Sequence, residues 1–203
     1  MLQSFYDTII VGDRWKLLVQ GLGTTLYISL CSIIIGTLLG CVFALLKISQ
    51  NRILRGAGNL YTTVIRGIPL ATQLMIFYFV VFAPLGLGRL TVAILAYGIN
   101  SGAYCTEIFR GGIQGVDIGQ TEAGRSLGLS RRQTLIKIIF PQAAKAALPA
   151  YTSEFITLIK ETAVASFIAV TDLTKVGDMI RNATYNAWIP LLSVGFLYLV
   201  MTL

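Results

Sequence analysis

Long apolar stretches alternate with short polar segments along the whole chain. A helix that crosses the hydrocarbon core of a bilayer needs about 20 consecutive, mostly apolar residues. The candidates for such helices are residues 17–46, 60–82, 90–109, 150–170 and 187–203. We therefore expect an all-α integral membrane protein with five transmembrane helices, organised as a single transmembrane domain over residues 1–203. Because the fifth stretch is short and has no basic flank, we also expect the natural chain to continue beyond it.

Glycines and prolines mark special positions in this pattern. Gly36 and Gly40 form a G-x-x-x-G pair, which either favours close contact with another membrane helix or reflects ordinary small residues. Pro69 is expected to kink the second helix and to free carbonyl groups that line a cavity. Residues 84–88 contain one proline and two glycines, which predicts a tight turn before the third helix.

The segment between the third and fourth apolar stretches, about residues 110–149, is polar and basic. Its charges are too dense for a membrane span. A short helix is expected over residues 118–127, with Asp117 and Gln120 in a capping arrangement before it and Gly128 as a left-handed residue after it.

A second short helix should follow directly. Ser130 and Gln133 match a capping box, and Pro141 is expected to break the helix after about Phe140. From composition alone, this helix is equally compatible with an amphipathic helix at the membrane surface whose basic residues touch lipid headgroups.

Composition and charge narrow the class of protein. Hydrophobic residues make up 55% of the chain and charged residues 12%, whereas a typical soluble domain has about 25% charged residues. The net charge is +7, which basic cytoplasmic loops explain better than nucleic-acid binding. The basic regions 47–55 and 110–149 are therefore expected on the cytoplasmic side, which places the N-terminus outside and the C-terminus inside.

No catalytic motif is recognisable in the sequence. Histidine is absent, so the usual zinc ligand and general base are missing. G-x-x-x-x-G-K-S/T does not occur, and residues 124–128 (G-R-S-L-G) match G-x-S-x-G by their letters but have no histidine in the chain to act as the base. We expect a non-catalytic chain that binds no metal or other cofactor and does not hydrolyse ATP itself. Cys31, Cys41 and Cys105 lie in apolar stretches and are expected to be free packing residues.

One part of the central segment follows a known spacing. Glu122-Ala123-Gly124 is followed after three residues by Gly128 and, after nine more, by Ile138-Ile139-Phe140-Pro141. This resembles the EAA loop in permease subunits of bacterial ATP-binding-cassette (ABC) importers, which reads E-A-A, three residues, G, nine residues, I-x-L-P. Every spacing is kept, while Gly124 and Phe140 depart from the family's letters.

Other segments resemble one subfamily, the polar amino acid uptake permeases, which includes histidine, glutamine, arginine and cystine systems. The similar segments are Arg66–Leu74 (R-G-T-P-L-x-x-Q-L in the family), Asn100–Ile113 (N-S-G-A-Y-x-x-E-I-x-R-G-G-I) and Leu148–Ala163 (L-P…N-E-F-I…K-D-T-S). The resemblance covers about residues 17–180. Glu161 stands where Asp is usual, and Ala163 where Ser is usual.

The resemblance implies a type I ABC importer permease in the bacterial cytoplasmic (inner) membrane. It implies as partners a second permease subunit, identical or related, two ABC ATPase subunits that bind ATP and Mg²⁺, an external amino acid binding protein and the lipid bilayer. The ATPase would drive alternating access through the 117–141 loop. The residues expected to couple the chain to the ATPase are Asp117, Gln120, Glu122, Ala123, Gly128 and Pro141.

Charged side chains inside predicted spans are costly and are therefore candidates for substrate contact. Glu107, Glu154 and Glu161 qualify, and because carboxylates pair with ammonium and guanidinium groups they favour a basic amino acid. Further candidates for polar lining are Gln73, Asn100, Tyr104 and Thr162. Structural alternatives stay open: Glu107 and Glu154 as structural groups near the cytoplasmic side, Glu161 paired with Lys160 or Arg66, and the polar residues in helix–helix hydrogen bonds.

Other functions are also compatible with the apolar pattern. An ion-coupled carrier would use one of the three glutamates as its titrating group and leave the central segment unexplained. A non-transport assembly or sensor subunit would need no acids inside its spans. Methionine and phosphonate permeases also carry an EAA loop, but the N-S-G-A-Y and K-E-T segments favour polar amino acids.

Overall fold

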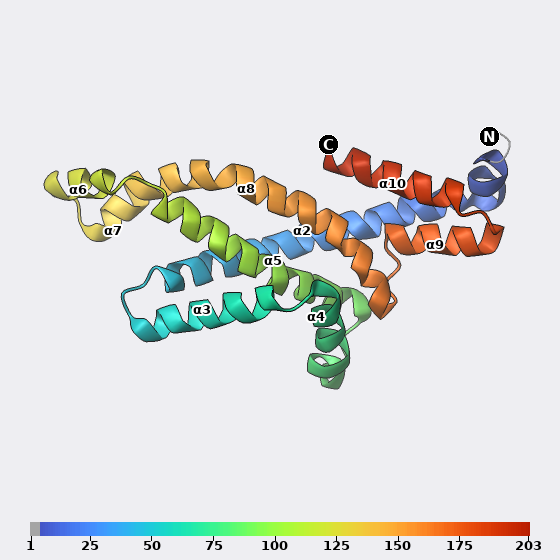
Figure 1. The fold of residues 1–203 in the computed structure, drawn as a ribbon, viewed down its shortest axis with the longest axis horizontal. Coiled ribbons are helices and arrows are strands. Elements are labelled where there is room, and N and C mark those ends of the chain that lie inside the picture. The colour runs from blue at the N-terminus through green and yellow to red at the C-terminus, as the bar shows by residue number, and fades with distance from the viewer. Residues whose placement is uncertain (1–4) are drawn as a thin grey trace. The chain divides into compact units, whose positions relative to one another are not determined.

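The computed structural model describes residues 5–203, and every regular element in that part of the chain is a helix (Figure 1). The elements are η1 (Tyr6–Ile10), η2 (Val11–Asp13), α2 (Arg14–Lys47), α3 (Arg52–Gly67), α4 (Leu70–Ile76), η3 (Phe77–Val81), η4 (Ala83–Leu85), α5 (Arg89–Gln114), α6 (Ile118–Ser126), α7 (Arg131–Thr134), η5 (Leu135–Ile139), α8 (Phe140–Glu161), η6 (Thr162–Ile168), α9 (Leu173–Thr184) and α10 (Trp188–Thr202). The all-α class expected from the apolar pattern is confirmed.

Two compact units share these helices. Unit 1 contains Met1–Ile34, Ile68–Gly98 and Ile156–Leu203, and unit 2 contains Ile35–Gly67 and Ile99–Phe155. In unit 1, a core cluster joins Ile9 and Leu18 to residues of α9 and to Val194 of α10. All residues of the candidate sites described below that contact one another belong to unit 2.

Close helix packing in unit 2 depends on glycine. A Cβ atom added to Gly40 of α2 would lie 2.5 Å from the Cβ atom of Cys105 on α5, and one on Gly36 would lie 3.1 Å from that of Ser101. The close contact expected from the G-x-x-x-G pair is therefore confirmed. Cys31, Cys41 and Cys105 are free, as expected.

Length and apolar character alone identify fewer spans than the sequence pattern. In the described residues, the stretch Tyr6–Lys47 passes both criteria, and a bent pair formed by Arg52–Gly67 and Leu70–Val81 would add a second span. The apolar helix α10 is shorter. The count of five transmembrane helices therefore stays a prediction.

The predicted second span, residues 60–82, is wrong as a single kinked helix. It is broken, because α3 ends at Gly67, α4 starts at Leu70, and Pro69 between them has a non-helical ψ of 137°. Pro69 caps the second piece and has no N–H group to continue the ladder of the first. Its neighbour Ile68 keeps its carbonyl bonded, since Gln73 Nε2 donates to it at 3.1 Å.

Pro141 does not break the second short helix, contrary to expectation. Helical structure runs through from Arg131 to Glu161, because η5 is a π-helical turn in which the N–H group of Phe140 bonds the carbonyl of Leu135. A proline has no N–H group and cannot donate the usual backbone hydrogen bond of a helix. The widened π-helical turn before Pro141 accommodates that missing bond, so the helix continues through the proline. The fourth span, predicted as 150–170, instead consists of α8 and the 3₁₀-helical η6.

Most of the polar segment between the fourth and fifth apolar stretches forms α9. Asp172 caps this helix: Oδ1 accepts from the backbone N–H of Lys175 at 2.9 Å and Oδ2 from that of Thr174 at 3.1 Å. The side chain is fully buried. Burial raises the pKa of the Asp172 carboxyl, although these hydrogen bonds act to lower it.

Candidate functional site

The helices of the 117–141 segment are fixed by hydrogen bonds between near neighbours in the sequence. Asp117 caps α6 by accepting from the backbone N–H of Gly119 at 2.7 Å. Gly128 follows α6 with φ of +82°, which is the left-handed conformation expected for it. Ser130 and Gln133 form the predicted capping box at the start of α7. The expected partnership of Asp117 with Gln120 is wrong in detail, since Gln120 accepts instead from Gln142 at 3.2 Å.

Gly124 brings α6 against the following helix. It is buried, and a Cβ atom on it would lie 2.8 Å from Cγ2 of Thr134 and 2.9 Å from Cδ1 of Ile138. Thr134 is itself 1% exposed. Gly124, the residue at which this chain departs from E-A-A, therefore lies in the contact between the two helices. A larger side chain there would push the helices apart.

Exposed apolar side chains flank Glu122 on the same short helix. Ile118 is 74% exposed and Leu127 at the end of α6 is 80% exposed, while Glu122 and Ala123 are also exposed. Apolar groups left uncovered beside a charge are typical of a surface that meets a partner. The other residues expected to couple the chain, Asp117, Gln120, Gly128 and Pro141, are exposed as well.

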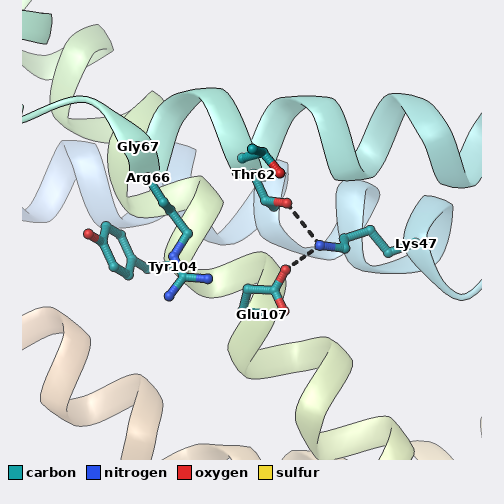
Figure 2. Close-up of a pocket in the computed structure, with 7 residues that line it drawn as sticks. Lys47, Thr62, Arg66, Gly67, Tyr104 and Glu107 are labelled. Carbon is teal, nitrogen blue, oxygen red and sulfur yellow. Dashed lines mark hydrogen bonds and ion pairs between the residues drawn. The ribbon is translucent and has the colours of Figure 1, made fainter.

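A pocket of about 460 Å³ lies elsewhere in unit 2, and we call it the α3–α5 pocket (Figure 2). Its lining residues are Lys47 at the end of α2, Thr62, Thr63, Arg66 and Gly67 of α3, and Tyr104 and Glu107 of α5. Three helices therefore contribute side chains to it, and most of these side chains are polar.

Glu107 is the centre of an ion-pair network. Lys47 Nζ bonds Glu107 Oε1 and also donates to Thr62 Oγ1 at 2.8 Å. Arg110 holds the other oxygen, Oε2, through Nε at 2.9 Å and Nη2 at 2.7 Å. Both of its oxygens are in ion pairs that tie α2 to α5, which supports the structural alternative for Glu107.

Arg66 and Tyr104 form the other side of the pocket. The guanidinium carbon of Arg66 lies 4.9 Å from the centre of the Tyr104 ring, a cation–π contact. Glu154 of α8 lies close enough for the charge of Arg66 to act on it, and its Oε1 accepts from Ser101 Oγ at 2.8 Å. Arg66 thus has an aromatic support and an acid in its neighbourhood.

The remaining substrate candidates lie outside the pocket. Asn100 is buried on α5, and Gln73 is occupied at the break after Pro69. Thr162 is buried and donates to the carbonyl of Ile159 at 2.8 Å, while Glu161 ends α8. Of the seven residues, the structure brings only Tyr104 and Glu107 together in the pocket.

Sequence reasoning missed Lys47, Thr62 and Thr63 as members of a site. A single lysine after a long apolar helix was the available signal for Lys47, because a charge at that position must find a partner or water. The threonines carried no such signal, since hydroxyl groups are common in membrane helices.

Comparison with known proteins gives consistent matches. The sequence model of the family described as "Binding-protein-dependent transport system inner membrane component" matches residues 32–203. The arginine transport system permease protein ArtQ of Bacillus subtilis is 40% identical over 188 residues, covering 92% of this chain and 86% of ArtQ. The putative glutamine transport system permease protein GlnP of Rickettsia bellii is 36% identical over 189 residues, covering 92% and 86% of the two chains.

Solved structures agree with these relatives. A chain in the crystal structure of an amino acid ABC transporter with histidines superimposes with a TM-score of 0.85. It is 40% identical in sequence, and the match covers 92% of this chain and 88% of that one. The two chains therefore share a fold as well as a sequence pattern.

Proposed function

The chain belongs to the binding-protein-dependent transport system inner membrane component family, and we propose that it is the permease subunit of an ATP-driven importer of polar amino acids. The resemblance first indicated by the EAA spacing is confirmed at the level of the family. The relatives named above are arginine and glutamine permeases, which supports an amino acid as the substrate. A basic amino acid is our preferred choice within that group, because of the acids Glu154 and Glu161.

The observation that carries the coupling part of the proposal is the construction of the 117–141 segment. Its two helices are capped, closely packed at Gly124, and exposed around Glu122. A part that transmits displacement must be stiff internally and accessible to the partner that moves it. We infer that a separate ATPase docks on α6 and that its movement switches the permease between two states as a rigid-body change.

The same proposal assigns partners and orientation. A second permease subunit would complete the pathway, two ATPase subunits would bind ATP and Mg²⁺, and an external binding protein would deliver the amino acid. The basic α2–α3 connection and the 117–141 segment would face the cytoplasm of a bacterial inner membrane. The N-terminus would then lie outside and the C-terminus inside. This chain would contribute no catalytic group to ATP hydrolysis.

Co-purification tests the docking surface. The permease is expressed with the ATPase of the same transport system, and the ATPase retained per permease is measured for wild type, Glu122→Arg and Lys145→Met. Charge reversal on the exposed face of α6 should lower retention at least tenfold. Lys145 is an exposed residue of α8 outside the segment, so its variant should behave like wild type. Equal retention in all three would place the ATPase elsewhere and favour the surface-helix alternative.

A further inference from the structure

The α3–α5 pocket contains more positive charge than its own acid neutralises. Its charged lining residues are Lys47, Arg66 and Glu107. Both oxygens of Glu107 are already held, one by Lys47 and the other by Arg110. Among the ion pairs formed within residues 5–203, none includes Arg66. The pocket therefore presents a guanidinium whose charge is not matched by an acid in direct contact.

Tyr104 orients that guanidinium. Figure 2 shows Arg66 extending from α3 with its guanidinium beside the Tyr104 ring of α5, and its guanidinium carbon lies over that ring in a cation–π contact. A guanidinium carries five N–H donors in a planar fork. This geometry suits a ligand that accepts two parallel hydrogen bonds.

The position of Arg66 argues against contact with lipid tails. It is exposed and lies one residue before the end of α3, beside the break in a segment that qualifies as a membrane span when both pieces are counted. A charge facing hydrocarbon is costly, whereas broken helices at membrane depth occur where they line a water-filled cavity. We therefore expect Arg66 to face an aqueous space.

We propose that Arg66, supported by Tyr104, binds the carboxylate of the transported amino acid. This inference rests on the proposed function and adds a recognition site to it. An arginine fork matches a carboxylate through two charge-assisted hydrogen bonds.

The consequence is a division of labour in recognition. A guanidinium matches the carboxylate that every α-amino acid carries at neutral pH. Arg66 would then recognise the substrate class, while the side chain is selected by other residues. Glu107 would contribute structure to the pocket rather than a contact with the substrate.

Binding of matched ligand pairs tests this assignment. The permease–ATPase complex is placed in phosphatidylcholine nanodiscs without binding protein, and Kd is measured for L-arginine, L-histidine and L-glutamine. The same is done for their decarboxylated counterparts agmatine, histamine and 4-aminobutanamide. Wild type should bind at least one amino acid tenfold or more tightly than its amine, since loss of a charge-assisted bidentate contact costs about that factor or more.

Arg66→Gln should weaken binding of that amino acid to the level of its amine and leave the Kd of the amine within twofold. Unchanged amine binding shows that the pocket is folded. Arg66→Lys should fall between, because it keeps the charge and loses the fork. Arg55→Gln is the matched control, since Arg55 is an exposed arginine of the same helix outside the pocket, and it should bind like wild type.

Three results would overturn the assignment. Equal weakening of amino acid and amine by Arg66→Gln would indicate a general effect on the pocket, and no weakening of either would remove Arg66 from recognition. If Arg66 instead holds a lipid phosphate, Arg66→Gln would leave amino acid binding unchanged and lower the phosphatidylglycerol retained in native mass spectrometry. Failure of wild type to bind any of the three amino acids would contradict the proposed substrate class itself, before any variant is compared.

Discussion

The 117–141 segment and the α3–α5 pocket lie in the same unit but are held together differently. In the segment, Asp117 bonds Gly119 and Ser130 bonds Gln133, so partners are close in the sequence. In the pocket, Lys47 and Glu107 are 60 residues apart. Local bonds make a stiff part that can move as a body, whereas long-range ion pairs fasten separate helices to each other. Substitutions that remove the Lys47–Glu107 ion pair should therefore disturb the whole unit, and those in the segment only the segment.

The largest effect is expected from Lys47→Met. It leaves Glu107 with Arg110 alone and removes a bond to the buried hydroxyl of Thr62. Removal of one partner from a buried pair costs about 3–5 kcal/mol, and we expect about 2–3 kcal/mol here because Arg110 still compensates. The apparent Tm in detergent should fall by about 4–10 °C. Lys145→Met is the control, and an equal shift in both variants would contradict the role of the ion pair.

Gly40→Val should have the next largest effect. The new side chain would collide with Cβ of Cys105 and with the backbone of α5 at 3.1 Å, and overpacking of this kind costs about 1–3 kcal/mol. Thermal unfolding again measures it, with Gly23→Val as the matched control on α2. An added Cβ at Gly23 meets nothing within 4 Å. If the two valines lowered Tm equally, helix propensity rather than the α2–α5 contact would be responsible.

Gly128→Ala should act only within the 117–141 segment. Its φ of +82° is unfavourable for a residue with a side chain, and the strain costs about 1 kcal/mol. Amide hydrogen exchange of residues 118–134 should accelerate about fivefold while Tm changes little. The control is Gly111→Ala, where an added Cβ meets nothing within 4 Å. Faster exchange throughout unit 2 would show that the segment is not an independent part.

Ser130→Ala should have the smallest effect of the four. It removes one half of the capping box of α7, which costs about 0.5–1 kcal/mol. Exchange of the first turn of α7 should accelerate about two- to fivefold, whereas Ser126→Ala, at the exposed end of α6, should leave it unchanged. Unaltered exchange in Ser130→Ala would mean that packing at Gly124, and not the cap, holds this helix.

The same contrast explains what could be predicted from the sequence. The boundaries of α6 and the start of α7 were predicted from helix caps and from Gly128, which depend only on a few neighbouring residues. The structure confirms these boundaries. Pro141 was misjudged because the sequence does not reveal the π-helical turn before it. A proline usually ends a helix, but this turn lets α8 continue.

The candidate site was predictable by residue type and not by pairing. Glu107 and Tyr104 were identified because charged and polar groups inside apolar helices are costly and are therefore candidates for function. That Glu107 pairs with Lys47, and that Arg66 lies on Tyr104, depends on how α2, α3 and α5 pack, which no local rule contains. The break after Gly67 was expected only as a kink, because a proline can either kink or break a helix.

ATP-driven uptake by the reconstituted transporter tests the central claim most directly. Permease and ATPase are placed in liposomes that contain ATP, the binding protein is added outside, and accumulation of labelled L-arginine, L-histidine and L-glutamine is followed. The account predicts that at least one of them accumulates only with hydrolysable ATP, and that Glu122→Arg abolishes this while Lys145→Met does not. Uptake that follows an imposed proton or sodium gradient without ATP, and that Glu122→Arg leaves intact, would contradict it and identify an ion-coupled carrier.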